Sequence, residues 1–310
     1  MRRIEYDRYG GPDLMHLADV APKLPAAHDV QVKVMAASVN PVDWKLRDGA
    51  LKLFSGKNFP RGMGSDFSGV VQSVGPQVTR FKVGDDVIGT TTPKNSGAFA
   101  ELVTTADKLL VVKPAALSYA QAAVLPIPGG TAWIALVEKA KLQAGQRIFV
   151  NGALGSVGRA AIAIARMRGA TVAGRVGAHS LAEASTCGLD PALDYAKSIP
   201  ADLNGAFDVV FDTNGSLSAA DGDRLRKPGG VVIDINPTTS KLLRMLLSRH
   251  RKLVFFNGKA KTLEKVVALA ANGQLSLPIG DTVKLDKAIP AITALERGKR
   301  QGGKLVLQVN

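Results

Sequence analysis

The sequence predicts an α/β protein with two parts, one rich in β-strands and one built on a doubly wound parallel sheet. Two observations carry this prediction. Before residues 114–119, short apolar runs alternate with Gly, Pro and Asp, which is typical of strands joined by turns. After that segment, strands of the buried type alternate with helical stretches, which predicts parallel strands joined by crossover helices.

The β-rich part is expected to use both ends of the chain. Its first strands are predicted at residues 30–34, 69–74, 86–89 and 102–103. Near the other end, residues 288–296 are apolar at helical spacing, and residues 304–309 alternate as a strand does. Because this closing strand suits the β-rich part better than a parallel sheet, we expect a first domain of residues 1–118 that is completed by residues 270–310.

The middle of the chain, residues 119–269, is expected to form the second domain. Its predicted strands are residues 147–151, 171–174, 209–212 and 231–235, and its predicted helices are residues 157–168, 181–186 and 217–225. Residues 241–252 place leucines on one side of a possible basic helix. For that segment we favour a helix that covers the substrate cleft or contacts another subunit, and the alternative is a basic helix that touches a membrane or an acidic partner.

A glycine-rich turn follows the first strand of this middle domain. Gly152, Gly155 and Gly158 allow the backbone to turn tightly, to approach a diphosphate and to pack a helix against its strand. Ser156 directly precedes the predicted helix, which begins at Val157, so the amides at its N-terminus face the phosphates. A purely structural turn is the alternative. Since a strand precedes the turn and a helix and a second strand follow it, the pattern favours nucleotide binding.

The end of the second strand favours NADPH over NADH. An acid about 20 residues past the glycines would bind the ribose hydroxyls of NAD, and none stands there. Instead Gly174 is followed by Arg175, and Ser180 comes shortly after. A guanidinium donates two parallel hydrogen bonds to a phosphate, so these residues fit a 2′-phosphate. A solvated surface arginine is the alternative.

The composition limits the classes of ligand and site that the protein can have. The 40 Lys+Arg against 26 Asp+Glu give a formal net charge of +14, which suits anionic ligands. No long block of basic residues is present, so specific nucleic-acid recognition is not expected. The single cysteine, Cys187, excludes an internal disulfide and a zinc site of several thiolates. Because the sequence shows neither a secretory signal nor a spanning apolar run, we expect a cytoplasmic protein without a transmembrane segment.

Ordered motifs along nearly the whole chain resemble one enzyme family. They are NPVDWK at residues 40–45, GSDFSGVV at 64–71, FKVGDDV at 81–87, GTAW at 130–133, FDVVFD at 207–212 and GGKLVL at 302–307. With the glycine turn, they resemble the zinc-independent quinone oxidoreductase (zeta-crystallin-like) branch of the medium-chain dehydrogenase/reductase superfamily, near the alkenal and enone reductases. The resemblance implies a GroES-like β-domain, a Rossmann domain that binds NADPH, and a homodimer.

The resemblance also implies site residues. Zinc-dependent relatives bind their metal at positions that carry Asn40, Ser65 and Asp66 here, so no metal site is expected. Asn40 and Lys45 are the candidate catalytic residues, which would stabilise the oxyanion that forms during hydride transfer. Lys45 stands where many relatives carry Tyr. The alternatives are a structural Asn-Pro turn and a solvated lysine. By family position, coenzyme contacts are also expected from Asn40, Thr131, Tyr195, Asn214, Asn236, Phe255 and Asn257.

The sequence therefore predicts an NADPH-dependent, metal-free reductase. It would deliver hydride to a quinone or to the β-carbon of an α,β-unsaturated carbonyl. Two alternatives of other classes stay open. One is a nucleic-acid-binding member of the same branch, and the other is a regulatory protein that binds the cofactor without catalysis.

Overall fold

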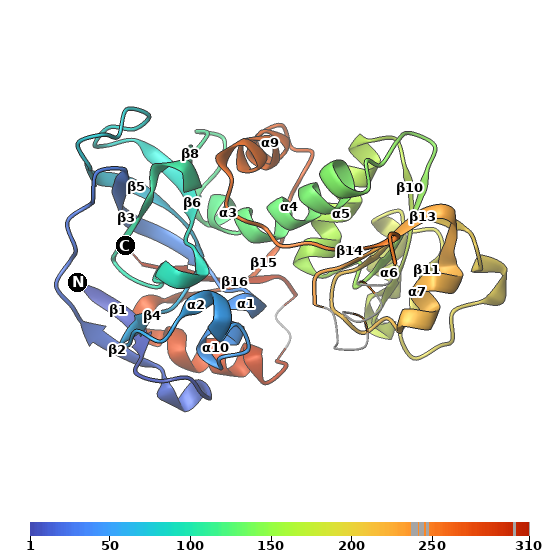
Figure 1. Cartoon of the computed structure of the whole chain (residues 1–310), viewed down its shortest axis with the longest axis horizontal. Coiled ribbons are helices and arrows are strands. Elements are labelled where there is room, and N and C mark those ends of the chain that lie inside the picture. Colours follow the sequence, from blue (N-terminus) through green and yellow to red (C-terminus); the bar gives the residue numbers. More distant parts are fainter. Residues whose placement is uncertain (237–240, 242–244, 246–247, 300–301, 310) are drawn as a thin grey trace. The chain divides into compact units, whose positions relative to one another are not determined.

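The computed structural model describes the whole chain except residues 237–240, 242–244, 246–247, 300–301 and 310 (Figure 1). Two compact units are present. The first comprises Met1–Ile127, Asn257–Gly273 and Leu277–Asn310, and the second comprises Pro128–Phe256 and Gln274–Ser276. The predicted ranges put the first boundary at residue 118 and the return at residue 270. In the structure the first unit runs on to Ile127 and also takes in Asn257–Gly273.

A seven-stranded sheet forms the centre of the first unit. Its spatial order is β15 (Ile279–Lys284), β16 (Lys304–Gln308), β3 (Asp29–Ser38), β5 (Asp66–Val74), β6 (Asp86–Thr90) and β8 (Leu110–Val112), with β7 (Leu102–Ala106) also paired to β3. A small antiparallel sheet has the order β2 (His16–Asp19), β1 (Arg2–Tyr6), β4 (Arg61–Gly62). Apolar side chains of both sheets meet in one core, to which Ile4, Val32, Phe67 and Leu307 contribute.

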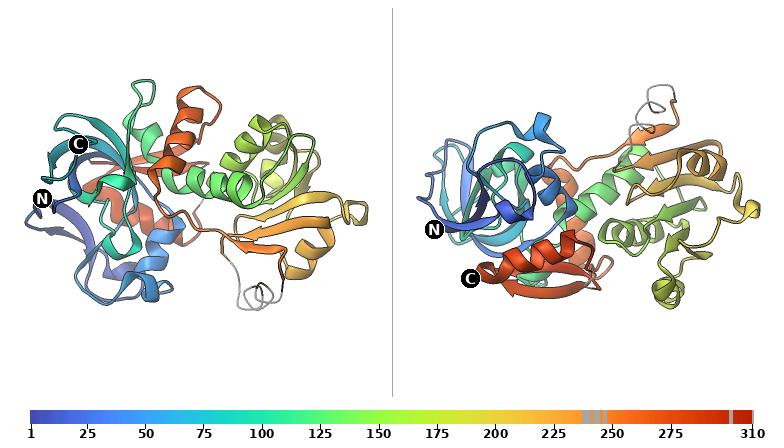
Figure 2. Two further views of the ribbon diagram at one scale, coloured as in Figure 1. Left: turned by 45° about the horizontal axis from the view of Figure 1, so that its top comes forward. Right: turned by 90° about the horizontal axis from the view of Figure 1, so that it is seen from below.

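Short helices complete this unit. They are α1 (Pro41–Arg47), α2 (Lys52–Ser55), α3 (Tyr119–Ala123), α9 (Ala260–Ala271) and α10 (Ala288–Glu296). The last of these lies beside β15, and both are drawn in red in Figure 2. A further helix, α4 (Pro126–Trp133), begins at the end of the first unit.

The pairing of β16 with β3 joins the two ends of the chain. The strands run antiparallel, with Val306 opposite Ser38, and Val39 N donates to Leu305 O at 3.0 Å. This register carries Lys304, the first residue of β16, to the place where β3 ends and α1 begins. The prediction that the C-terminal strand belongs with the β-rich part is confirmed by this pairing.

The second unit is a six-stranded parallel sheet with helices on its faces. The spatial order is β11 (Ala192–Asp194), β10 (Thr171–Val176), β9 (Arg147–Asn151), β12 (Phe207–Asp212), β13 (Arg226–Asp234), β14 (Arg251–Leu253). In order along the chain this is 3-2-1-4-5-6, the order of the Rossmann fold. Figure 2 shows α5 (Ser156–Met167) and α7 (Ala219–Leu225) on opposite faces of the sheet. The predicted fold class is confirmed.

Several elements differ from the prediction. The strand expected at residues 231–235 is β13, which begins earlier at Arg226 because parallel pairing with β12 continues past the Pro-Gly-Gly sequence. Of the possible helix at residues 241–252, residues 242–244 and 246–247 lie outside the described part. Arg251 and Lys252 belong to β14, since β13 supplies their backbone partners. Among the described residues, no helix is both long and apolar enough to cross a membrane.

Candidate functional site

The glycine-rich turn links β9 to α5 and can exist only with glycine at two positions. Gly152 has φ +89°, a conformation that other residues rarely adopt. A Cβ on Gly158 would lie 2.2 Å from Gly152 O, so the helix can approach the turn this closely only without a side chain there. Gly155 is the N-cap of α5, and Ser156, Val157 and Gly158 form its first turn. Their amides point out of the helix N-terminus and suit an anion.

The neighbouring strand β10 holds the turn in place. Gly152 N and Ala153 N both donate to Arg175 O, at 3.2 and 3.1 Å. A Cβ on Gly174 would lie 2.6 Å from Val150 O and 2.9 Å from the Ala153 Cβ, so this position also requires glycine. The three predicted glycines of the turn and Gly174 therefore belong to one closely packed backbone assembly.

Arg175 lies at the end of β10, near Tyr195. Its Nη2 donates to Tyr195 O at 2.7 Å, and its guanidinium carbon lies 5.3 Å from the centre of the Tyr195 ring. The Nε of Arg175 is buried and has no hydrogen-bond partner within the described part of the chain. A donor buried in this way suits an anionic ligand. Ser180, half-buried, precedes α6 (Leu181–Thr186) at the same end of the sheet.

A side-chain network fixes the carboxyl ends of β9 and β12. Asn151 Nδ2 donates to Asp212 Oδ1 at 2.9 Å and to Asn214 Oδ1 at 2.8 Å. Asn214 Nδ2 in turn donates to the Tyr195 hydroxyl at 3.2 Å. Burial raises the pKa of Tyr195, so that hydroxyl stays protonated at neutral pH. The predicted residues Tyr195 and Asn214 are thus brought together.

Asp212 is the centre of this network and was missed by sequence reasoning. Its carboxylate accepts from the backbone N of Gly215 at 2.9 Å and of Leu217 at 3.1 Å, which shapes the loop after β12. The ammonium of Lys241 lies 2.6 Å from Asp212 and 2.7 Å from Asp234. A buried cation between two carboxylates ties the ends of β12 and β13 together. The signals available were the position of Asp212 at the end of a buried strand and its place as the last residue of the FDVVFD motif at residues 207–212.

Among the remaining predicted coenzyme residues, Asn236 lies close to the loop that holds Asn214, since a Cβ on Gly215 would lie 2.6 Å from Asn236 O. Asn236 and Phe255 follow the ends of β13 and β14, and Phe255 is 56% exposed. Thr131 is buried within α4, where the Phe256 ring packs against the adjacent Gly130. Asn257 is exposed at the surface of the first unit, and its Oδ1 accepts from Lys259 N at 3.3 Å.

The first unit contains a buried polar cluster, formed by Asn40, Asp43, Ser65, Asp66 and Lys304. Asn40 Oδ1 accepts from Lys304 Nζ at 2.6 Å, and Asn40 Nδ2 donates to Asp66 Oδ2 at 3.0 Å and to Ser38 O at 3.3 Å. Asp43 accepts from Asn40 N at 2.7 Å and from Ser65 Oγ at 2.8 Å. The amide of Asn40, predicted as catalytic, is therefore engaged inside the protein.

The titratable groups of this cluster have shifted pKa values. Burial raises the pKa of Asp43 to about 6 and the pKa of Asp66 to about 7, because a carboxylate loses its hydration there. The same desolvation lowers the pKa of Lys304 to about 8, while the charges of Asp66 and Asp43 act in the opposite direction. The pKa values of these three groups therefore lie within about one unit of neutral pH.

The buried polar cluster does not fit a zinc ion. Zinc sites in proteins are built mainly from Cys and His ligands, whereas this cluster offers an amide, a hydroxyl and two carboxylates. Those groups already bond to one another and to the Lys304 ammonium. The Lys304 ammonium thus already supplies a positive charge where a zinc ion would have to bind.

Lys45, the other predicted catalytic residue, lies on α1 and is half-buried. Burial lowers its pKa, which is partly opposed by the charge of Asp48. An ammonium with a lowered pKa gives up a proton more easily than a solvated lysine does. Lys45 therefore suits the role of a proton or hydrogen-bond donor.

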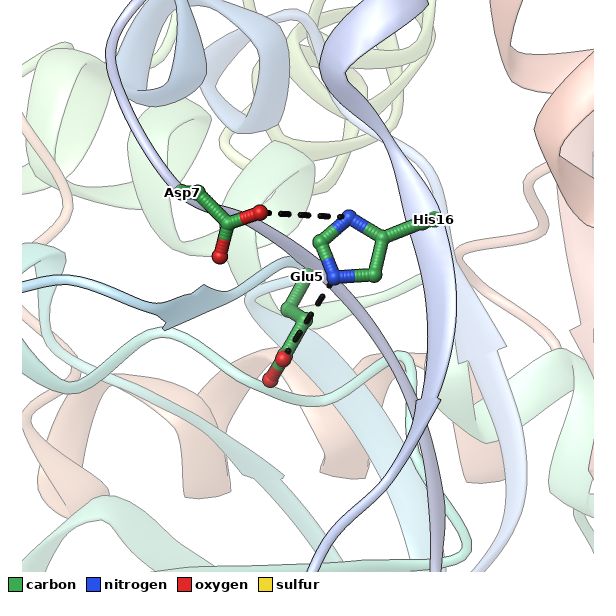
Figure 3. Close-up of side chains that lie close together, drawn as sticks. All are labelled: Glu5, Asp7 and His16. Atoms are coloured by element: carbon green, nitrogen blue, oxygen red, sulfur yellow. Dashed lines mark ion pairs between the residues drawn. The ribbon is translucent and has the colours of Figure 1, made fainter.

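A second group of possible metal ligands lies on the small sheet of the first unit. Figure 3 shows His16 between Asp7 and Glu5, with nitrogen–oxygen distances of 3.8 and 3.6 Å. Glu5 also forms an ion pair with Arg3. Because Arg3 already compensates the buried Glu5, and because Asp7 is exposed, we do not assign a cation site to this group.

Comparisons with known proteins agree with this architecture. The family described as "Alcohol dehydrogenase GroES-like domain" matches residues 26–115, and the one described as "Zinc-binding dehydrogenase" matches residues 187–307. Quinone oxidoreductase of Mus musculus is 31% identical over 336 residues, which cover 99% of this chain and 97% of the mouse protein. The 2-methylene-furan-3-one reductase of Solanum lycopersicum is 34% identical over 319 residues, 99% of this chain and 79% of the tomato protein.

A solved structure shows the same fold over the full length. The quinone oxidoreductase of Coxiella burnetii has a TM-score of 0.86 and 28% sequence identity, and the match covers 100% of this chain and 99% of that one. The β-domain and the parallel sheet with its glycine turn define a two-domain oxidoreductase of the alcohol dehydrogenase class. Within that class, the chain belongs to the quinone oxidoreductase branch of the medium-chain dehydrogenase/reductase superfamily.

Proposed function

We propose that this oxidoreductase binds NADPH and transfers hydride to a quinone or to the β-carbon of an α,β-unsaturated carbonyl, with no metal in the reaction. The observation that carries the proposal is the turn between β9 and α5 with Arg175 beside it. Gly152 and Gly158 hold main-chain amides where a diphosphate can reach them, and the buried Nε of Arg175 lacks a partner in the described structure.

The choice of acceptor rests on the relatives and on the site chemistry. The mouse and tomato relatives are named for a quinone and for a methylene-furanone, and both compounds are conjugated carbonyls. Such acceptors are already electrophilic. Their reduction needs a hydrogen-bond donor near the carbonyl oxygen more than it needs a Lewis acid. This agrees with the buried polar cluster, whose side chains do not suit zinc.

In this mechanism the residues of the chain bind the coenzyme, orient the acceptor and donate a proton to it. When bound, the reduced nicotinamide supplies the hydride. The amides of Ser156, Val157 and Gly158 bind the diphosphate, and Arg175 with Ser180 binds the 2′-phosphate.

Other predicted residues have supporting parts. We assign contacts with the rest of the coenzyme to Thr131, Tyr195, Asn214, Asn236, Phe255 and Asn257. Lys45 donates to the carbonyl oxygen as that atom gains charge. For Asn40, whose amide is bonded within the buried polar cluster, we propose a role in holding α1 rather than direct contact with the substrate.

The test is a panel of acceptors. NADPH oxidation by the purified protein is followed by absorbance with quinones, enones and enoyl thioesters, and NADH is run in parallel. We expect turnover with at least one conjugated acceptor and a higher kcat/KM with NADPH. Absence of turnover on the whole panel by protein that still binds the coenzyme would contradict the proposal.

We also infer a homodimer in solution, as the family resemblance implies. Light scattering on the eluting protein is expected to give about twice the chain mass of 32.5 kDa. Since each chain carries a formal net charge of +14, the dimer should be favoured by added salt. A mass of a single chain at all salt concentrations would exclude it.

A further inference from the structure

Lys304 is placed by close backbone packing at the start of β16. A Cβ on the preceding Gly303 would lie 2.5 Å from Pro278 O and 2.6 Å from Gly280 N. Lys304 N donates to Pro278 O at 2.8 Å. The backbone of Lys304 is thereby fixed against the segment that enters β15, and the β16–β3 register aims its side chain at the end of β3.

The ammonium of Lys304 donates hydrogen bonds to the two residues that precede α1. It is buried, with 5% of the residue exposed, and it donates to Val39 O at 2.5 Å and to Asn40 Oδ1 at 2.6 Å. On the other side of the same amide, Asn40 Nδ2 donates to Asp66 at 3.0 Å. Because a cation holds the oxygen and a carboxylate holds the nitrogen, the amide of Asn40 has one orientation.

Asn40 is also the residue from which α1 begins. It occupies the N-cap position, and Asp43 at the third helical position accepts from Asn40 N. Ser65 Oγ donates to the second oxygen of Asp43, which ties the first turn of α1 to the start of β5. The position of α1 therefore depends on Asn40. Lys45 is carried by the next turn of the same helix.

We propose that Lys304 is a positioning residue of the reductase: through Asn40 it holds the N-terminus of α1 and so sets the position of Lys45. This inference rests on the proposed function, in which Lys45 donates to the carbonyl oxygen of the acceptor. Lys304 itself touches neither coenzyme nor substrate.

A competing role for Lys304 is charge compensation alone. The ammonium lies within Coulombic reach of Asp66 and Asp43, and a buried carboxylate that loses its cation strongly destabilises a protein. Lys304→Met by itself would therefore confound the two roles. The double variant Lys304→Met/Asp66→Asn separates them, because between about pH 7 and pH 8, where both groups are charged, it removes one charge of each sign. The amide introduced by Asp66→Asn still offers an oxygen to the amide of Asn40 and to Ile127 N, so the groups that lose a donor are the Asn40 oxygen and Val39 O, next to the start of α1.

The comparison is between this double variant, Asp66→Asn alone and Lys284→Met. Lys284 is exposed on the neighbouring strand β15 and serves as the matched lysine control. We expect the double variant to unfold at a urea concentration close to that of Asp66→Asn. Its kcat should be lower than that of Asp66→Asn by about 100-fold, the loss that a displacement of about 1 Å can cause. The KM for NADPH should be unchanged, because the coenzyme residues of the second unit are intact.

A second readout does not depend on activity. Trp44 lies on α1, packed against the core, and Trp133 is the only other tryptophan. In a Trp133→Phe background, fluorescence therefore reports on α1. We expect a shift of the Trp44 emission in the double variant and none in Asp66→Asn or Lys284→Met.

The two readouts keep the proposals distinguishable. If the double variant has the kcat and the Trp44 emission of Asp66→Asn, Lys304 only compensates charge and the inference is overturned. If wild-type protein reduces no acceptor, the proposed function fails by itself. The Trp44 emission then still decides whether Lys304 positions α1.

Discussion

At the scale of single residues, the sequence predicted which residues are candidates for the site, but it did not predict their hydrogen-bond partners. Arg175 was predicted because it follows Gly174 at the end of a strand, and the structure adds its contact with Tyr195. Asn40 was predicted as a donor, yet its amide is engaged by Lys304, which lies 264 residues away in the sequence. Strand pairing creates such contacts, and no local pattern contains them.

Coenzyme preference tests Arg175. The variant Arg175→Asp places a carboxylate where the 2′-phosphate is proposed to bind, so kcat/KM for NADPH should fall by about 10- to 100-fold. This is the range expected when charge-assisted hydrogen bonds worth about 1.5 to 3 kcal/mol are lost. The kcat/KM for NADH should increase or stay unchanged. Arg147→Asp is the control, since Arg147 also stacks on an aromatic ring, Phe207, but at the opposite end of the sheet. An equal loss with both coenzymes would remove the 2′-phosphate role.

Acceptor reduction tests Lys45. Lys45→Met removes the donor while it keeps most of the apolar length, and kcat should fall by about 100-fold, as when one oxyanion donor is removed. Lys45→Tyr should retain more activity, because a phenol can also donate. Lys52→Met on the exposed part of α2 should behave as wild type. If Lys45→Met keeps the wild-type kcat with quinones and enones alike, the donor must be sought elsewhere.

At the scale of elements, the glycine turn and its helix were the most predictable part. Strand β9 has the predicted bounds, and α5 begins one residue before the prediction. Their periodicity is strong and the turn has little conformational choice. Strands β14 and β15 and helix α9 were not predicted, because short or weakly patterned segments take their structure from tertiary partners.

The turn itself makes a prediction. Gly158→Ala introduces a Cβ that would lie 2.2 Å from Gly152 O, so the helix must move away from the turn. We expect the affinity for NADPH, measured by calorimetry, to fall by about 10-fold or more as amide–phosphate bonds are lost.

Gly145→Ala controls for the backbone cost of replacing glycine. Gly145 has φ +78° and open space around it, so this variant should lose stability without losing affinity. Unchanged coenzyme affinity in folded Gly158→Ala would show that the turn does not bind the diphosphate.

At the scale of the whole molecule, the two parts and their connection were visible in the sequence. The change from short strands to alternating strands and helices predicted a β-domain and a parallel sheet, and the final strand was correctly returned to the β-domain. The exact ends of the units were not predictable, because Ile127 and Asn257 lie in segments without a change in composition. Packing decides to which unit such segments belong.

Stability should depend on pH through the buried polar cluster. The folded protein raises the pKa of Asp66 to about 7 from an ordinary value of 3.8, so between about pH 4 and pH 7 the folded state holds a proton that the unfolded state has released. The free energy of unfolding therefore falls as pH rises through this window. Asp66→Asn should lose this part of the dependence, although Asp43 retains a weaker one below about pH 6.

Urea unfolding of the first unit, followed by Trp44 fluorescence in the Trp133→Phe background, measures the effect at several pH values. Asp286→Asn, at an exposed position of the same unit, is the matched control and should leave the slope unchanged. Identical slopes for wild type and Asp66→Asn between pH 4 and pH 7 would show that Asp66 is ionised throughout the range.

The proposal as a whole depends on the binding of a nicotinamide coenzyme by the second unit. A calorimetric titration of the purified protein with NADPH and with NADH tests this most directly. We predict saturable binding of NADPH, with a dissociation constant on the order of micromolar, and weaker binding of NADH. Absence of measurable binding for both reduced coenzymes would contradict the account, since the reaction would then have no source of hydride.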